Sequence, residues 1–187
     1  MLALLLSHSL ALADDAPAQA LRDGPRLGYS AGVMGFVGDL SEDPARLVQE
    51  AQVETLFVRS ASGRLGGHLS IATLWGETHH DGQDFPFPED ADLRVLSFVF
   101  VANLCWLSRP ALEGCLGLGE GTVNINAPGN RRDFGTWNYA AELAWSPVPR
   151  LSVVGRGRFI GSVEQQVEGE DAAFSLYTGT AGLRWSF

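Results

Sequence analysis

The stretch that decides the fold lies at the end of the chain, Phe174–Phe187, and reads FSLYTGTAGLRWSF. Within it, one set of alternating positions is mostly large and apolar, and the other set is mostly small or polar. The first set comprises Tyr177, Gly179, Ala181, Leu183, Trp185 and Phe187, and the second comprises Leu176, Thr178, Thr180, Gly182, Arg184 and Ser186. A period of two residues is typical of a β-strand, because successive side chains point to opposite faces of a sheet. The stretch therefore predicts a strand whose two faces meet different surroundings.

Seven earlier segments show similar alternation, and no convincing amphipathic helix lies between them. These segments are Leu27–Gly38, Val53–Arg59, Gly67–Trp75, Asp92–Trp106, Glu113–Gly119, Thr136–Trp145 and Leu151–Ile160. The face pattern of Val53–Arg59 is ambiguous, so we assign no residue of that segment to a face. With the last strand, they predict an all-β chain of eight strands.

The connections between these strands alternate in length. The long ones are Gly38–Gln52, Gly76–Ala91, Glu120–Gly135 and Gly161–Ala173, and the short ones are Ser60–Gly66, Leu107–Leu112 and Ser146–Arg150. The short ones contain turn-forming pairs such as Ser62-Gly63 and Arg109-Pro110. Long loops at one end and short turns at the other predict an eight-stranded antiparallel up-and-down transmembrane β-barrel.

Composition excludes several other classes of protein. Hydrophobic residues make up 45% of the 187 residues, which excludes a disordered chain. The longest strongly apolar stretch, Val95–Leu107, is too short for a membrane-spanning helix, which needs about 18 apolar residues. The net charge is -9 and all 13 basic residues are arginine, with no basic run longer than Arg131-Arg132, so we expect no nucleic-acid partner.

Residue size indicates which face of the strands is inside. The less apolar face is rich in small residues, such as Gly28, Ser30, Gly32 and Gly182, which suit the crowded interior of an eight-stranded barrel. The apolar face has aromatic residues towards strand ends, where a lipid bilayer meets water. These are Trp75, Trp106, Trp145 and Trp185. The pattern favours lipid outside, and a soluble secreted ligand-binding barrel is the alternative.

The chain ends on Leu183-Arg184-Trp185-Ser186-Phe187, which resembles the C-terminal signal of bacterial outer-membrane β-barrels. With eight strands, the chain resembles the small OmpA/OmpX-like members of that class over nearly all of its mature length. The resemblance implies that Leu183, Trp185 and Phe187 are read by the barrel-assembly machinery. It also implies a location in the outer membrane of a Gram-negative bacterium, surrounded by lipid and lipopolysaccharide.

The N-terminus predicts export. Residues 1–13 are mostly apolar and end in the A-x-A site Ala11-Leu12-Ala13, as in a secretory signal peptide, although a short core helix is the alternative. We expect residues 14–24 to form a flexible lead-in and residues 25–187 to form the barrel domain.

Cys105 and Cys115 flank the Arg109-Pro110 turn at equal distances along the chain, so a hairpin centred there places them opposite each other. Opposed Cβ atoms are close enough to be bridged, and the periplasm is oxidising. We therefore predict a Cys105–Cys115 disulfide inside the barrel, with two free buried thiols as the alternative.

Four charged residues fall on the predicted inner face: Glu142, Arg156, Arg158 and Arg184. Charges in a narrow lumen must be paired or hydrated. We expect a polar network that fills the lumen, with an ion path as the alternative.

Two histidine motifs raise other chemistry. The sequence His68-Leu69-Ser70 is similar to the His-x-Ser pair of lipid A deacylases, but no acidic residue is obviously placed to orient His68. His79, His80 and Asp81, with Glu77 and Asp84, could bind a metal in the second long loop. We expect neither, and therefore no catalytic residue, cofactor or metal.

The four long loops contain twelve more acidic than basic residues. Such loops suit a solvated surface, and their carboxylates could be bridged by divalent ions to lipopolysaccharide phosphates. The leading function is therefore a structural or surface-interaction role, with lipopolysaccharide or an envelope or external protein as partner. A lipid-modifying enzyme and a narrow channel are the alternatives.

Overall fold

The computed structural model describes residues 24–37, 46–80, 91–109, 111–127, 129–163, 165–167, 170–172 and 174–187. The expected signal peptide, residues 1–13, and nearly all of the lead-in lie outside the described residues. Among the described residues, no helix is long and apolar enough to cross a membrane.

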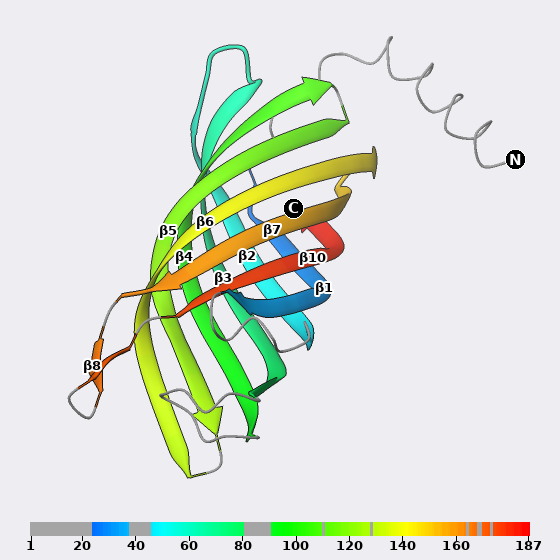
Figure 1. Ribbon diagram of the computed structural model, residues 1–187. Coiled ribbons are helices and arrows are strands. Elements are labelled where there is room, and N and C mark those ends of the chain that lie inside the picture. Colours follow the sequence, from blue (N-terminus) through cyan, green and yellow to red (C-terminus); the bar gives the residue numbers. More distant parts are fainter. Residues whose placement is uncertain are drawn as a thin grey trace, which may run out of the picture.

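Eight strands form one closed antiparallel barrel, which confirms the predicted fold (Figure 1). They are β1 (Arg26–Val37), β2 (Arg46–Arg59), β3 (Leu65–His80), β4 (Ala91–Arg109), β5 (Leu112–Ala127), β6 (Asn130–Val148), β7 (Leu151–Ser162) and β10 (Ser175–Ser186). Each strand pairs with its neighbours along the chain, and the first strand, β1, pairs with the last, β10. A separate two-stranded sheet, β8 (Gln165–Val167) and β9 (Glu170–Ala172), lies between β7 and β10.

The strands are strongly staggered around the barrel. A path can be drawn around the barrel that starts at Trp106 on β4 and moves each time to the register partner on the next strand. This path returns to β4 at Leu96, so the stagger around the whole barrel is ten residues. In a closed barrel, stagger and strand number together set the tilt and diameter, and eight strands leave room only for side chains.

Several strands are longer than predicted at the long-loop end. The predicted third long loop, 120–135, is wrong: β5 and β6 stay paired up to Ala127 and Asn130, and Gly129 makes the turn with a φ of 76°. In the predicted first long loop, Arg46–Gln52 belongs to β2. The alternation continues in these segments, but with polar residues outside and apolar residues inside.

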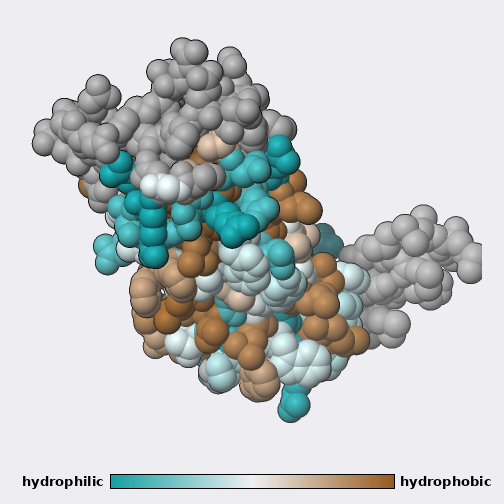
Figure 2. Space-filling view, turned by 90° about the horizontal axis from the view of Figure 1, so that it is seen from below, coloured by the Kyte–Doolittle hydropathy of each residue, from teal (hydrophilic) through white to brown (hydrophobic). Residues whose placement is uncertain are grey.

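Much of the outer face of the barrel is apolar, and hydrophilic residues gather over one part of it (Figure 2). Trp137 and Trp145 both point outward from β6, at 40% and 43% exposed. Eight residues separate them, which at ~3.3 Å per residue and a tilt of ~40° is about 20 Å along the barrel axis. Register places Trp75 and Tyr177 near the level of Trp137, and places Trp106 and Trp185 near the level of Trp145. An apolar band between two aromatic girdles is typical of membrane barrels.

The interior has two chemically distinct halves. At the long-loop end, apolar side chains form a packed core that includes Phe134, Met34, Leu74, Leu93, Ile125 and Leu176, none more than 2% exposed. At the short-turn end, the interior is polar and charged. The sequence predicted small and polar residues inside, so the apolar half is a finding of the structure.

A β-bulge explains the ambiguous pattern of Val53–Arg59. The register between β2 and β3 shifts between Leu56 and Val58, so Phe57 and Val58 are both exposed. Glu54, before the bulge, is buried in the lumen.

Candidate functional site

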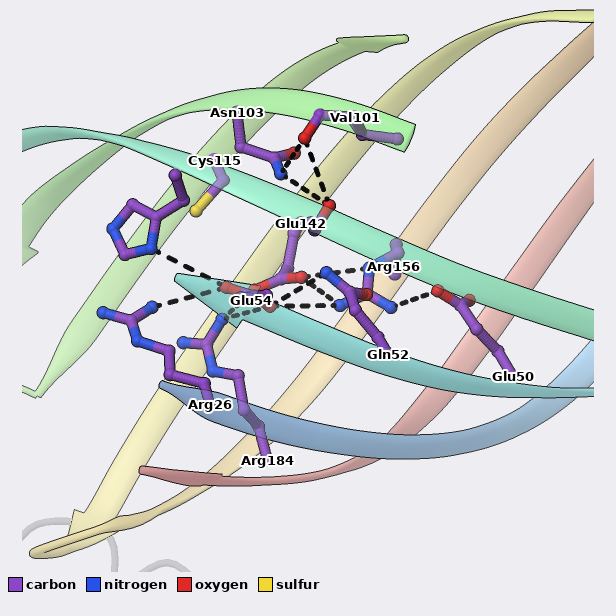
Figure 3. A network of polar contacts seen from close by, with 12 residues as sticks. Arg26, Glu50, Gln52, Glu54, Val101, Asn103, Cys115, Glu142, Arg156 and Arg184 are labelled. Carbon is purple, nitrogen blue, oxygen red and sulfur yellow. Dashed lines mark hydrogen bonds and ion pairs between the residues drawn. The ribbon is translucent and has the colours of Figure 1, made fainter. Parts of the chain in front are cut away.

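The polar half of the lumen holds a network of four glutamates and four arginines (Figure 3). The acids are Glu50, Glu54, Glu113 and Glu142, and the bases are Arg26, Arg156, Arg158 and Arg184. They come from six strands: β1, β2, β5, β6, β7 and β10. No side chain of the eight is more than 9% exposed.

Arg184 holds one end of the network. Its guanidinium donates to Glu142, to Glu113 at 2.8 Å and to Glu54 at 3.4 Å. Arg26 donates to both carboxylate oxygens of Glu113, at 2.7 and 3.2 Å. Such two-pronged pairing fits the planar guanidinium and is stronger than a single hydrogen bond. Arg26 and Arg184 thus connect β1 and β10 to β5 across the lumen.

Arg156 and Arg158 hold the other end. Arg156 donates to Glu142, with Nε at 3.0 Å, and also to Glu50. Arg158 donates to the same Glu50 oxygen at 2.7 Å, and the Glu50 side chain is 0% exposed. Glu50 therefore compensates two buried positive charges.

The structure brings together all four charged residues that the sequence placed in the lumen: Glu142, Arg156, Arg158 and Arg184. It adds Glu50, Glu54, Glu113 and Arg26, which sequence reasoning missed. The sequence predicts a loop at Glu50, and Glu54 lies just before the bulge that disturbs the alternating pattern. The run Val48, Glu50, Gln52 and Glu54 is itself alternating, and that signal could have placed both acids on the inner face.

The network has equal numbers of positive and negative groups. A buried charge is costly unless it is paired, and here each of the eight groups has an opposite partner. Side chains from opposite walls meet in the middle of the lumen, as Figure 3 shows for Arg156 and Glu50. The arrangement suits a polar plug that ties the strands together.

His68 and Ser70 also point into the lumen, and both are buried. His68 Nδ1 lies 3.8 Å from Glu54 Oε2, which corrects the expectation that no acidic residue is placed near it. Ser70 Oγ accepts a hydrogen bond from Asn103 Nδ2 at 3.0 Å and donates to Val101 O at 3.4 Å. Because the pair faces the packed interior, it does not meet the lipid outside the barrel.

The predicted Cys105–Cys115 disulfide is present, with the two Cα atoms 4.1 Å apart. Glu113 lies beside it, with Oε1 3.6 Å from Cys115 Sγ. The two sulfurs are bonded to each other and so are not metal ligands. Of the predicted loop cluster, Glu77 pairs with Arg94 at 3.2 Å. Asp81, Asp84 and the side chains of His79 and His80 lie outside the described residues.

We expect the double substitution Cys105→Ala/Cys115→Ala to lower the free energy of unfolding. The disulfide spans only 10 residues, so the loss should be near the low end of about 2–4 kcal/mol. Urea titration of the barrel in detergent micelles measures it. An unchanged midpoint would show that the hairpin register is held fully by the surrounding strands.

The predicted C-terminal signal residues form an exposed apolar stripe on β10. Leu183 is 54%, Trp185 45% and Phe187 63% exposed. The stripe runs along the seam where β10 pairs with β1, and Phe187 N donates to Pro25 O at 3.1 Å.

Four strands project beyond the rest of the barrel at the long-loop end. The far ends of β4, β5 and β6 reach past β1, β7 and β10 in Figure 1, and β3 stays paired with β4 up to His80. The outer face of this projecting sheet is polar, whereas its inner face is apolar. The outer side chains include Glu77, Arg94, Asn124, Asn126, Arg131 and Asp133, and the inner ones include Leu93, Val95, Val123, Ile125 and Phe134.

One edge of the projecting sheet is open among the described residues. The β6–β7 ladder ends at Thr136 and Ser162, and one further bond joins Val163 N to Gly135 O at 2.8 Å. The backbone groups of Arg131 and Asp133 point to the same side as those of Gly135, because strand geometry repeats every two residues. No described residue forms a backbone hydrogen bond with them on that side.

No protein-family model matches this chain, and no curated protein matches its sequence. Among solved structures, it is similar to Neisserial surface protein A, with a TM-score of 0.59 and 11% identity over 88% of this chain and 97% of that one. It is also similar to the outer membrane protein OprG from Pseudomonas aeruginosa, with a TM-score of 0.52 and 10% identity over 91% of this chain and 99% of that one. At these identities the likeness shows the fold, which is that of small outer-membrane β-barrels.

Proposed function

We propose that this protein is an integral outer-membrane β-barrel with a sealed lumen, which acts at the outer surface through its projecting sheet and long acidic loops. The apolar outer face between two aromatic levels supports the membrane location. Lipid and lipopolysaccharide would then contact the outer face, and the barrel-assembly machinery would read the stripe of Leu183, Trp185 and Phe187. Export would require removal of residues 1–13.

The observation that carries the surface role is the edge of β6 at Arg131 and Asp133, which no described residue covers. A strand edge with free N–H and C=O groups can pair with another extended segment. Arg131 and Asp133 alternate in charge along the outer side of this edge, where an incoming strand would meet them. The partner class that fits is therefore a protein segment in extended conformation.

Photo-crosslinking in living cells tests this role. A benzoylphenylalanine at position 131 or 133 should form covalent adducts with a second protein, and one at the lipid-facing position 141 should not. Asp133→Pro removes the edge-facing N–H and should abolish the adduct made from position 131, whereas Asp133→Ala should preserve it. If neither edge position forms adducts, or if Asp133→Pro leaves them unchanged, the edge is not a docking site.

The sealed lumen predicts that the reconstituted barrel conducts no ions. Within the described part of the barrel, the network occupies the short-turn half and the apolar core occupies the long-loop half, and we infer that together they block a continuous water path. Planar-bilayer recordings should show no single-channel steps, with a wide porin as the positive control in the same bilayer. Regular current steps from the purified barrel would favour the narrow-channel alternative.

A further inference from the structure

The Cys105–Cys115 disulfide is buried inside the barrel at its short-turn end, beside the ion network. Cys105 is 0% and Cys115 is 4% exposed. The two residues face each other on the β4–β5 hairpin, and each has its other register partner on a neighbouring strand, Gly66 on β3 and Glu142 on β6. The sulfurs are thus enclosed by the barrel wall on one side and by the ion network on the other.

The side chain beside the sulfurs, Glu113, belongs to the same hairpin as Cys115, and arginines from the two strands that close the barrel hold it in place. Glu113 lies against Cys115 Sγ and is held by Arg26 from β1 and by Arg184 from β10. β1 and β10 are the first and last strands, and their pairing is the seam of the barrel. Neither arginine can hold Glu113 until β1 and β10 have joined the barrel.

Disulfide chemistry requires access that the closed barrel does not give. A thiolate must approach a sulfur directly and form a mixed disulfide, so the partner active site has to reach the cysteine. The pairing is local, with the cysteines only 10 residues apart, so they can meet during transient formation of the hairpin, which takes only microseconds. We therefore propose that Cys105 and Cys115 are oxidised in the periplasm before the barrel closes, by a thiol–disulfide oxidoreductase, and that closure then shields the disulfide from exchange.

The step balances as two successive exchanges. One cysteine thiolate attacks the disulfide of the oxidoreductase and forms a mixed disulfide, which releases one enzyme thiolate. The second cysteine thiolate then attacks the sulfur of the first and expels the other enzyme thiolate. The chain loses two electrons and two protons overall, and the enzyme disulfide becomes a dithiol. The resulting bridge fixes Cys105 opposite Cys115, which sets the register of β4 and β5 before the remaining strands pair.

The proposal rests on the outer-membrane location but not on the surface role, and it is tested on the whole chain. Oxidised barrel folded in micelles is treated with dithiothreitol, and the free thiols are counted with a maleimide that shifts gel mobility. We expect no labelling of the folded barrel over the time in which the same chain in urea is fully labelled. In the converse arm, reduced chain is folded and then given oxidised glutathione, and we expect the thiols to stay reduced.

Two sets of variants make the test specific. Ser108→Cys in a Cys105→Ser/Cys115→Ser background places a thiol at the exposed end of β4, and it should be labelled in the folded barrel. Arg184→Ala removes one of the two arginines that hold Glu113 beside the disulfide and should speed reduction of the folded barrel by about tenfold. The matched control Arg94→Ala, which changes an exposed arginine of the projecting sheet, should leave the rate unchanged.

The order of events in cells completes the test. In a pulse-chase, the disulfide should appear before the compact, heat-modifiable form of the barrel. Reduction of the wild-type folded barrel as fast as in urea would overturn the proposal, and so would a compact reduced form that is oxidised later in cells. If the reduced chain does not fold, the reduction arm and the pulse-chase still decide the question.

Discussion

Replacing Glu50 with glutamine is expected to lower the free energy of unfolding by about 3–5 kcal/mol, because it leaves a buried positive charge without its carboxylate. Arg158 has Glu50 as its ion-pair partner in the structure, and its side chain is 1% exposed. Arg156 keeps Glu142 in the variant, so the loss arises mainly at Arg158. Urea unfolding in lipid vesicles, followed by tryptophan fluorescence, measures the change.

The matched control is Glu120→Gln, which alters an exposed glutamate on β5 and should change stability by no more than about 0.5 kcal/mol. The double variant Glu50→Gln/Arg158→Met removes both charges and should recover much of the loss, as expected when an uncompensated charge is the cause. Equal losses in the single and double variants would show that Glu50 acts by packing and not by charge.

Replacing Phe134 with alanine is expected to cost about 3–5 kcal/mol, because it opens a cavity in the apolar half of the lumen. Phe134 is 1% exposed, and its ring packs edge-on against Phe174 with 4.8 Å between ring centroids. Phe134→Leu retains most of the volume and should cost much less.

Hydrogen exchange locates the effect of the Phe134 substitution. We expect faster exchange in Val123–Phe134, the part of the β5–β6 hairpin that lies over the apolar core, with little change in β10 within the membrane. Uniform acceleration throughout the barrel would contradict this, since it would mean that the projecting sheet and the membrane band unfold as one unit.

The sequence predicted the strands of the membrane band well and those above it poorly. The strand predicted over Phe174–Phe187 agrees with β10 to within one residue at each end. The pattern is clear there because outward positions face lipid and are apolar, whereas inward positions face a crowded lumen and are small or polar. Along β5 the demands reverse: Leu116 and Leu118 face lipid, whereas Asn124 and Asn126 face outward into water. The alternation continues along β5, but the apolar residues move from the outward positions to the inward ones. In the sequence this change looks like the end of a strand, and so the sequence predicts a loop over 120–135.

The network could be predicted only in part, because its partners are distant in sequence. Glu50 and Arg158 are 108 positions apart, and they meet through the closure of the barrel and not through any local pattern. The disulfide was predictable because its two halves lie on one hairpin, where the turn alone sets which residues face each other. Local geometry is readable from one sequence, whereas contacts across the lumen require the stagger of the whole barrel.

The spacing of Trp137 and Trp145 on one strand also sets the depth of lipid that this protein can accommodate. An apolar band of about 20 Å is shorter than the ~30 Å hydrocarbon core of an average bilayer. A thicker bilayer would have to thin around the barrel or cover the carboxylate of Asp133, which points outward from β6 four residues beyond Trp137, and either adjustment costs free energy for each ångström of mismatch. The barrel is therefore matched to a thin membrane. Its depth in the bilayer is fixed by the level at which the outward-facing residues of its strands change from apolar to polar.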